Sequence, residues 1–113
     1  KESSAASDVY KRQIMKLLGG LGIPIAYHHF AEGESPEPPF LIYLTPGSHN
    51  FSADGMVYFK VKQLDVELYT DKKDIALEEE LEKILDAQGI FYNKTETYIK
   101  SEKLYEVLYE LEV

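Results

Sequence analysis

The chain has 113 residues, 44% of them apolar, which is enough for a single domain with one modest hydrophobic core. It contains no cysteine, which excludes disulfides, thiolate metal sites and cysteine nucleophiles. Its net charge of −8 argues against binding nucleic acid through phosphate contacts, and no apolar run approaches the roughly 18 residues of a membrane span.

The first predicted element is a helix over residues 8–18. Residues 1–7, KESSAAS, are small and polar and are interpreted as a disordered lead-in or an expression remnant, which leaves 8–113 as the single domain. Apolar side chains in 8–18 recur every three or four residues, as on one face of a helix. Ser7 or Asp8 can cap its start by accepting free backbone N–H groups.

Two short strands with a proline-rich loop between them are expected next. The run IPIAYHHF over 23–30 has the composition of a strand. The run FLIYLT over 40–45 is apolar, lies between Pro39 and Pro46, and is too short for a helix. The prolines of 31–39 cannot donate to a strand ladder, so that segment is predicted to be a loop.

Residues 56–70, MVYFKVKQLDVELYT, predict a long strand whose buried face changes partway along. Side chains alternate faces along a strand, so one buried face cannot hold apolar residues at both odd and even positions. We expect either a β-bulge near Lys62–Gln63 or an outer half that packs on another subunit. The preceding connection, 46–55, has Pro-Gly and Asp-Gly at its ends, which is turn chemistry. The apolar positions are Val57, Phe59 and Val61 in the first half, and Leu64, Val66 and Leu68 in the second.

The last third of the chain predicts a helix and a closing pair of antiparallel strands. Residues 74–88 carry an apolar stripe, with Asp74 as the N-cap and Gly89 as the residue that ends the helix. Residues 91–99 and 103–113 have the composition and alternation of strands. The predicted fold class is therefore α+β, with a mainly antiparallel sheet, two helices packed on one face and a long protruding β-hairpin.

Two adjacent histidines, His28 and His29, are the first candidates for chemistry. In a strand they would point to opposite faces, so they could not bind one metal ion together without distortion. They are interpreted as ordinary residues at the end of a strand, and no metal, cofactor or small-molecule substrate is expected. The other side chains that could join them are His49, Glu32, Glu34 and Glu37, three of which lie in the proline-rich loop.

No other pattern in the sequence indicates catalysis. There is neither a nucleophile elbow nor a phosphate-binding loop. The acidic residues at 78–80 and 82 fall in the second predicted helix. They are interpreted as a solvated face rather than as an acid–base pair or a site for a hard cation. The chain is therefore predicted not to be an enzyme.

Aromatic residues suggest where a partner could bind. The chain has nine tyrosines and five phenylalanines, and tyrosine is enriched at protein interfaces. The 46–55 connection is either a plain hairpin tip or a segment that orders against a partner, with Phe51 as its apolar anchor. The candidate residues for a subunit or partner interface are His49, Asn50, Phe51, Asp54, Tyr58 and Phe59.

Three phrases occur in a suggestive order: PPFLIY at 38–43, the strand that ends in LYTDKKD at 68–74, and the helix that follows at once. In this pattern the chain resembles the small tail-terminator and tail-completion (head–tail joining) proteins of long-tailed bacteriophages and of prophages. The resemblance covers roughly residues 8–113. It rests on the order of elements and on short phrases, so no functional residue is carried over from that family.

The resemblance implies a structural role in the virion tail or at the head–tail interface, after assembly in the cytoplasm of the bacterial host. Such proteins are often homohexameric rings around the channel through which DNA passes, and they use no cofactor. The implied partners are further copies of the chain, tail-tube proteins and head-connector proteins, with passive contact to passing DNA and none to a membrane. We hypothesise that acidic strands line this channel; a basic lumen in a ring structure would contradict it.

Two other classes of protein are kept as alternatives. The chain could be a small host binding or regulatory module without enzymatic activity, and tail genes beside its gene would argue against this. It could also be a metal-dependent enzyme built on His28, His29 and His49. Metal analysis of the purified protein tests that hypothesis, because an enzyme of this kind would contain stoichiometric metal.

Overall fold

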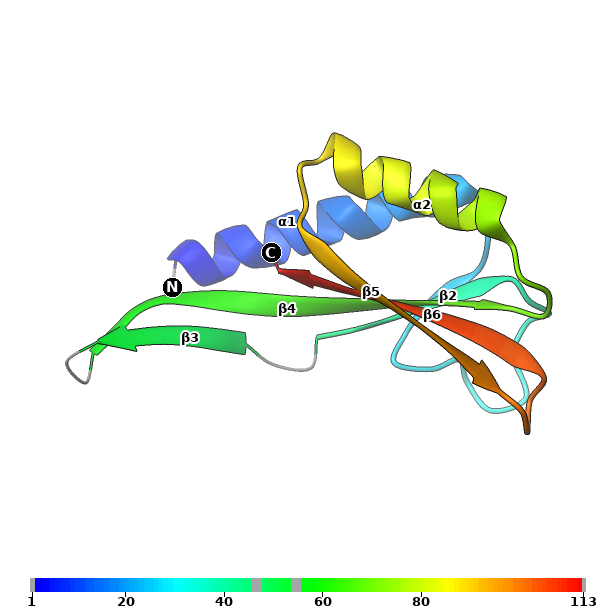
Figure 1. Cartoon of the computed structure of the whole chain (residues 1–113). Helices are drawn as coiled ribbons and strands as arrows, with labels where there is room; N and C mark the ends of the chain where they lie inside the picture. The colour runs from blue at the N-terminus through cyan, green and yellow to red at the C-terminus, as the bar shows by residue number, and fades with distance from the viewer. Residues whose placement is uncertain (1, 46–47, 54–55, 113) are drawn as a thin grey trace.

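Two helices lie on one side of a sheet with the strand order β1-β2-β4-β6-β5 (Figure 1). This computed structural model describes the backbone of residues 2–45, 48–53 and 56–112, and the side chains of residues 9–45 and 63–112. The arrangement confirms the predicted α+β class and mainly antiparallel sheet. The elements are α1 (Glu2–Leu18), the 3-10 turn η1 (Gly19–Leu21), β1 (Ile25–Tyr27), β2 (Phe40–Leu44), β3 (Ser48–Ala53), β4 (Met56–Thr70), α2 (Ile75–Ala87), β5 (Tyr92–Ile99) and β6 (Leu104–Glu112).

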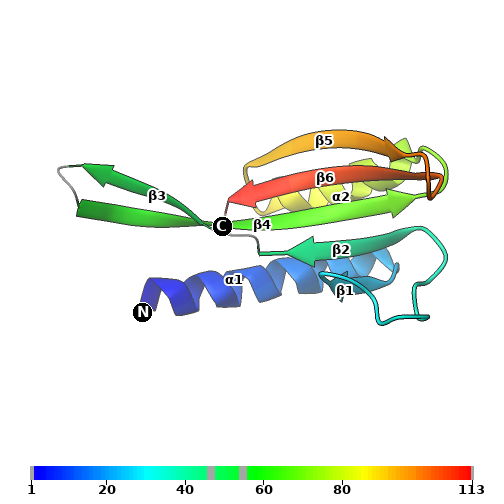
Figure 2. The same cartoon turned by 90° about the horizontal axis from the view of Figure 1, so that it is seen from below.

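The strand β4 belongs to two different pairings along its length. Its second half, from residue 63 onward, pairs antiparallel with β6 on one side and with β2 on the other. Its first half pairs antiparallel with β3 (Figure 2). The edge strand β1 pairs parallel with β2, and the loop 28–39 carries the chain back between them. The strand β4 is therefore central in the sheet at one end and a hairpin strand at the other.

The β3–β4 hairpin contains a β-bulge near its turn. The register of β3 and β4 shifts between Phe51 and Ser52, which leaves Tyr58 as the extra residue on β4. The ladder with β3 ends at Lys62 and the ladder with β6 begins at Gln63, so a bulge between these two residues stays a prediction. How far the hairpin protrudes stays a prediction, because residues 46–47 and 54–55 lie outside the described part of the chain.

The helix α1 begins earlier than expected. It starts at Glu2, so residues 2–7 continue the helix rather than precede it, and the predicted N-cap at Ser7 or Asp8 is wrong. Its end agrees with the prediction, since the chain tightens into η1 and then turns at Gly22, where φ is +75°. Only glycine adopts this left-handed conformation without cost from a side chain.

The helix α2 follows the sequence prediction closely. The backbone N–H of Leu77 donates to Asp74 Oδ1 at 3.0 Å, which confirms Asp74 as the N-cap. Gly89 has a φ of +67° just after the helix and turns the chain toward β5. Leu81 and Leu85 are fully buried on the predicted apolar stripe.

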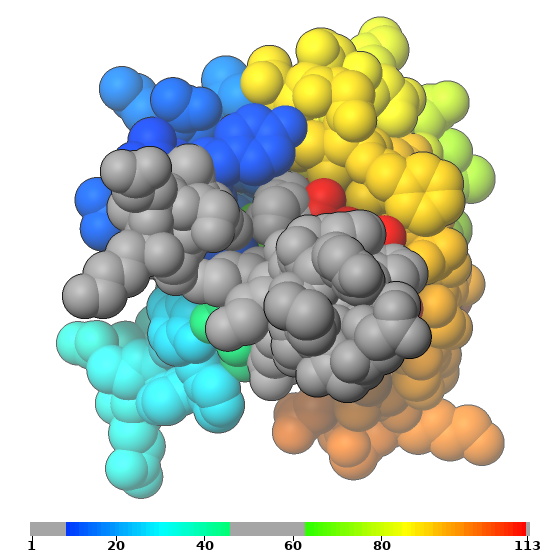
Figure 3. Space-filling view, turned by 90° about the vertical axis from the view of Figure 1, so that its left-hand side faces the viewer, coloured from blue at the N-terminus to red at the C-terminus, as the bar shows by residue number. Residues whose placement is uncertain are grey.

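The hydrophobic core lies between the two helices and one face of the sheet. Ile14 and Leu18 of α1 and Leu81 and Leu85 of α2 pack on that face. An end-on view shows α1 in blue beside the yellow end of α2 and the start of β5 in the upper half of the molecule (Figure 3). The fully buried sheet residues are Leu41, Leu64, Val66, Leu68, Val107, Tyr109 and Leu111.

Candidate functional site

The predicted interface residues lie on the β3–β4 hairpin. His49, Asn50 and Phe51 belong to β3, and Tyr58 and Phe59 belong to β4. The pairing places the backbone of Phe51 directly opposite that of Phe59. Asp54 and the side chains of the other five lie outside the described residues, so the predicted interface stays a prediction.

The adjacent histidines do not lie as the sequence predicts. The strand β1 ends at Tyr27, and His28 has a φ of +66°, which turns the chain instead of continuing the strand. As a result the Nδ1 atoms of His28 and His29 lie only 2.9 Å apart. The prediction of opposite faces is therefore wrong. In the described part of the chain, no group of three or more histidine, aspartate or glutamate side chains is placed to hold a metal ion; the His49 side chain lies outside that part.

A buried carboxylate, Glu78, joins α2 to the sheet. It is 3% exposed, and its carboxylate oxygens lie 2.6 Å from Lys73 Nζ and 2.8 Å from Lys94 Nζ. Burial alone would raise the pKa of Glu78, but the hydrogen bonds from the two lysines outweigh it and hold that pKa below its usual value. The prediction that this acidic run is only a solvated face is wrong at Glu78.

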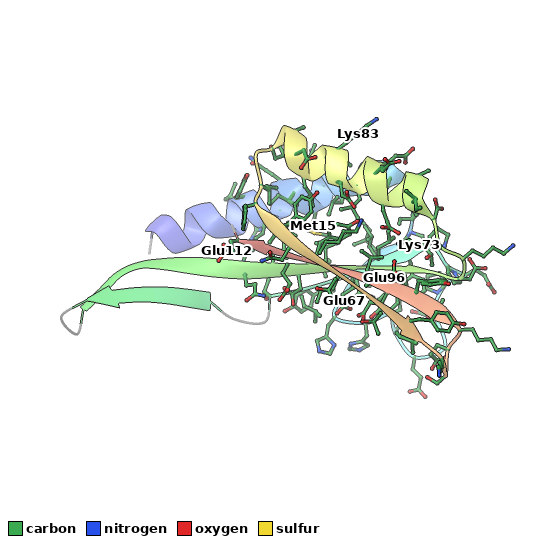
Figure 4. The ribbon with its side chains drawn as sticks, in the orientation of Figure 1. Met15, Glu67, Lys73, Lys83, Glu96 and Glu112 are labelled. Carbon is green, nitrogen blue, oxygen red and sulfur yellow. The ribbon has the colours of Figure 1, made fainter. Side chains whose placement is uncertain are left out.

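The same network extends to the core tyrosine of β6. Glu82 Oε2 lies 2.6 Å from Lys94 Nζ and accepts a hydrogen bond of 2.7 Å from the hydroxyl of Tyr109. Burial opposes the charge on Lys94, yet its bonds to Glu78 and Glu82 raise its pKa to about 12. Lys73 also pairs with Glu96 of β5, as the labelled side chains show (Figure 4). The network thus ties α2 to β5 and β6 through paired charges.

The face of the sheet away from the helices carries a different kind of surface. In β2, β4 and β6 the side chains that alternate with the core residues point to this face, and most of them are half-buried. Glu67 points to this side in Figure 4, and the loop after β1 (cyan) and the end of β5 (orange) project at its two margins in Figure 3. The side chains that define this open face are Phe40, Ile42, Leu44, Asp65, Glu67, Tyr69, Glu106, Leu108 and Glu110.

One pair of acids on the open face shares a single donor. The hydroxyl of Tyr69 lies 2.9 Å from Glu67 Oε1 and 2.9 Å from Glu106 Oε2. A hydroxyl has one hydrogen, so it cannot donate fully to both carboxylates. Burial, followed by the negative charge of Glu106, raises the pKa of Glu67 more than the bond from Tyr69 lowers it.

A second pair of acids lies further along the same strands. Asp65 and Glu110 are directly opposite each other on β4 and β6. The amide of Gln63 bridges them: its Nε2 donates to Asp65 Oδ1 at 3.1 Å and to Glu110 Oε2 at 3.3 Å. Like charges placed opposite each other destabilise a sheet. Within the described residues, no basic side chain forms an ion pair with the four open-face carboxylates.

Replacing Glu67 by glutamine is expected to stabilise the monomer at pH 7. A carboxyl whose folded pKa is raised binds more protons in the folded state, so its unfavourable contribution disappears as the pH falls toward its unfolded value. The ordinary pKa of a glutamate side chain is 4.5. The advantage of Glu67→Gln in urea unfolding should therefore be largest at pH 7 and vanish near pH 4.5. Glu80→Gln, at an exposed position of α2, is the matched control, with an expected change within about 0.5 kcal/mol. A Glu67→Gln variant that is less stable than wild type at pH 7 would contradict this account.

An open hollow of about 390 Å³ adjoins the acidic rows. Phe40 and Tyr69 are among its lining residues, and their rings stack with their centres 5.2 Å apart. Leu104 and Ile99 add apolar surface to the lining, and His28 contributes from the loop after β1. This lining can receive an apolar or aromatic side chain of a partner.

The comparisons with known proteins assign no class to the chain. Models of known protein families give no match, and no curated protein matches the sequence. No helix among the described residues is both long and apolar enough to cross a membrane. Any functional conclusion therefore depends on this chain's own residues and geometry.

Proposed function

We propose that this chain is a structural virion protein of a phage or prophage. It would form a ring at the end of the tail that terminates the tail tube or joins it to the head connector. The observation that carries the proposal is the strand β4, whose second half belongs to the main sheet while its first half pairs with β3 alone. Such a hairpin offers a surface to a neighbour while the core stays within the subunit.

The chemistry of the described residues also supports a binding role rather than catalysis. The charges of Lys73, Lys94, Glu78 and Glu82 between α2 and the sheet are paired with one another, and the open face combines carboxylates with apolar side chains. A ring built from identical subunits needs two different patches on each copy. The open face and the hairpin are separate parts of this molecule, so they satisfy that requirement.

Deleting the gene is the test of this proposal. We expect separate heads together with unjoined or overlong tails in electron micrographs, because the tail would lack the protein that ends or joins it. An image of the virion with this subunit located should place it at the tail end or the neck. Normal virions from the deletion would overturn the proposal.

A small host binding module is the second candidate, and the aromatic hollow beside the open face is the observation that favours it. The two candidates predict different gene neighbourhoods. Tail genes next to this gene support the virion role, whereas their absence together with normal virions supports the binding module.

A further inference from the structure

A basic and partly apolar stripe runs along the outer side of α1. Arg12 and Lys16 are exposed one helical turn apart, and Val9 and Leu17 beside them are 50% and 40% exposed. Figure 4 shows Met15 between α1 and the sheet, so this stripe is on the helix side turned away from the core. Residues 9–18 contain three basic residues and no acidic one, in a chain whose net charge is −8. We define the α1 stripe as Val9, Arg12, Gln13, Lys16 and Leu17.

The open face has the complementary composition. It offers four carboxylates without a cationic partner among the described residues, next to half-buried leucines at positions 44 and 108. Neither Arg12 nor Lys16 forms an ion pair with a described residue either. Each surface therefore lacks the charge that the other one carries.

The spacing of the charges also agrees. Lys16 is four positions after Arg12 on the helix, which is a rise of about 6 Å. Glu67 is two positions after Asp65 on the strand, which is about 6.6 Å. The two cations can therefore meet two successive rows of carboxylates, while the apolar members of both surfaces cover the rest of the contact.

We propose that the α1 stripe of one copy of this chain docks on the open face of a second copy. The helices lie on one side of the sheet and the open face on the other (Figure 1), so the α1 stripe cannot contact the open face of its own subunit. Two different patches on opposite sides join subunits head to tail, which closes a ring or extends a filament. The inference rests on the proposed ring assembly, which supplies the second copy, and it names the surfaces that make the contact.

Two charge reversals test the contact, each breaking one surface only. Arg12→Glu/Lys16→Glu gives a copy with an acidic stripe and an intact open face. Glu106→Lys/Glu110→Lys gives a copy with an intact α1 stripe and an open face whose charge is neutralised. The new lysines would lie beside Glu67 and Asp65 and could pair with them, so the variant is expected to fold. Lys83→Glu, at an exposed position of α2 outside both surfaces, is the matched control.

Sedimentation velocity and native mass spectrometry of the full chain at low salt provide the readout, with circular dichroism to confirm folding. We expect wild type and Lys83→Glu to form oligomers larger than dimers that weaken as salt is added. Each double reversal alone should associate about tenfold or more weakly. A mixture of the two should give a one-to-one dimer and nothing larger, because it contains one intact contact that cannot propagate.

The outcomes separate this inference from the proposed function. If both double variants still form the same oligomers as wild type, the contact between the α1 stripe and the open face is overturned. A ring built through another surface would remain compatible with that result. A wild-type monomer at high concentration and low salt would also overturn it, whereas the gene deletion still decides the virion role. Should Glu106→Lys/Glu110→Lys not fold, Glu106→Gln/Glu110→Gln replaces it, and an unchanged association of that variant counts against the proposal.

Discussion

Replacing both Lys73 and Lys94 by methionine is expected to lower the free energy of unfolding by about 3–5 kcal/mol, because it leaves the Glu78 carboxylate buried without a cation. Glu78 is 3% exposed and sits between the two ammonium groups. Methionine keeps the length and apolar body of each lysine, so packing changes little. Urea unfolding at pH 7 measures the effect.

The control for this prediction is Lys83→Met on α2. Lys83 lies on the outer side of the helix in Figure 4, and its substitution should change stability by less than about 0.5 kcal/mol. Adding Glu78→Gln to the double variant should recover part of the loss, since no buried charge then remains. A double variant as stable as Lys83→Met would show that water reaches Glu78 and that the network contributes little.

The network also predicts the direction of acid sensitivity. The two lysine partners hold the pKa of Glu78 in the folded protein below the ordinary glutamate value of 4.5. A depressed carboxyl pKa contributes stability above the unfolded value, and that stability is lost as the pH falls through the folded pKa. Asp65 and Glu67 of the open face, whose pKa values are raised by burial, act in the opposite direction at higher pH. The wild-type protein should therefore be most stable between neutral pH and the range in which Glu78 becomes protonated.

The second large effect is expected at Leu111 of β6. Leu111→Ala should cost about 2–5 kcal/mol, because Leu111 is fully buried and its removal leaves a cavity between the sheet and the helices. Leu108 is on the same strand but on the open face, where it is only half-buried. Leu108→Ala should therefore cost less than about 1.5 kcal/mol when measured at a concentration where the protein is monomeric.

This pair of leucines separates folding from assembly. If the open face docks α1 of another copy, Leu108→Ala should weaken association more than it weakens the fold, whereas Leu111→Ala should do the reverse. Urea unfolding and sedimentation of the same two variants give both quantities. Equal losses of stability at the two positions would contradict the assignment of β6 side chains to two different faces.

The fold class could be predicted because its signals are local. Asp74 and Gly89 mark the ends of α2. The apolar run at 40–44 is too short for a helix and forms a largely buried strand. The start of α1 could not be predicted, since residues 2–7 are small and polar and carry no apolar stripe. Helix formation in such a segment depends on its continuation from the packed part of the helix rather than on its own composition.

The candidate surfaces were harder to find from the sequence. Alternation in β4 identifies Asp65 and Glu67 as lying on one face, but nothing local states that Glu106 and Glu110 lie beside them. That juxtaposition depends on strand order, which is a long-range property. Glu78 was missed for a related reason, because its burial requires Lys94 of β5 to reach across from the sheet.

The two carboxylates that share the hydroxyl of Tyr69 affect which symmetric contacts two copies of the chain can make. Two open faces brought together would place Glu67 and Glu106 of one copy against the same acids of another, with no cation among the described residues of either face to separate them. Like charges opposed across an interface cost several kcal/mol, so a two-fold dimer through this face is disfavoured. An acidic sheet surface thus disfavours a symmetric contact with the same face of another copy, and it leaves this face available for the head-to-tail contact proposed above.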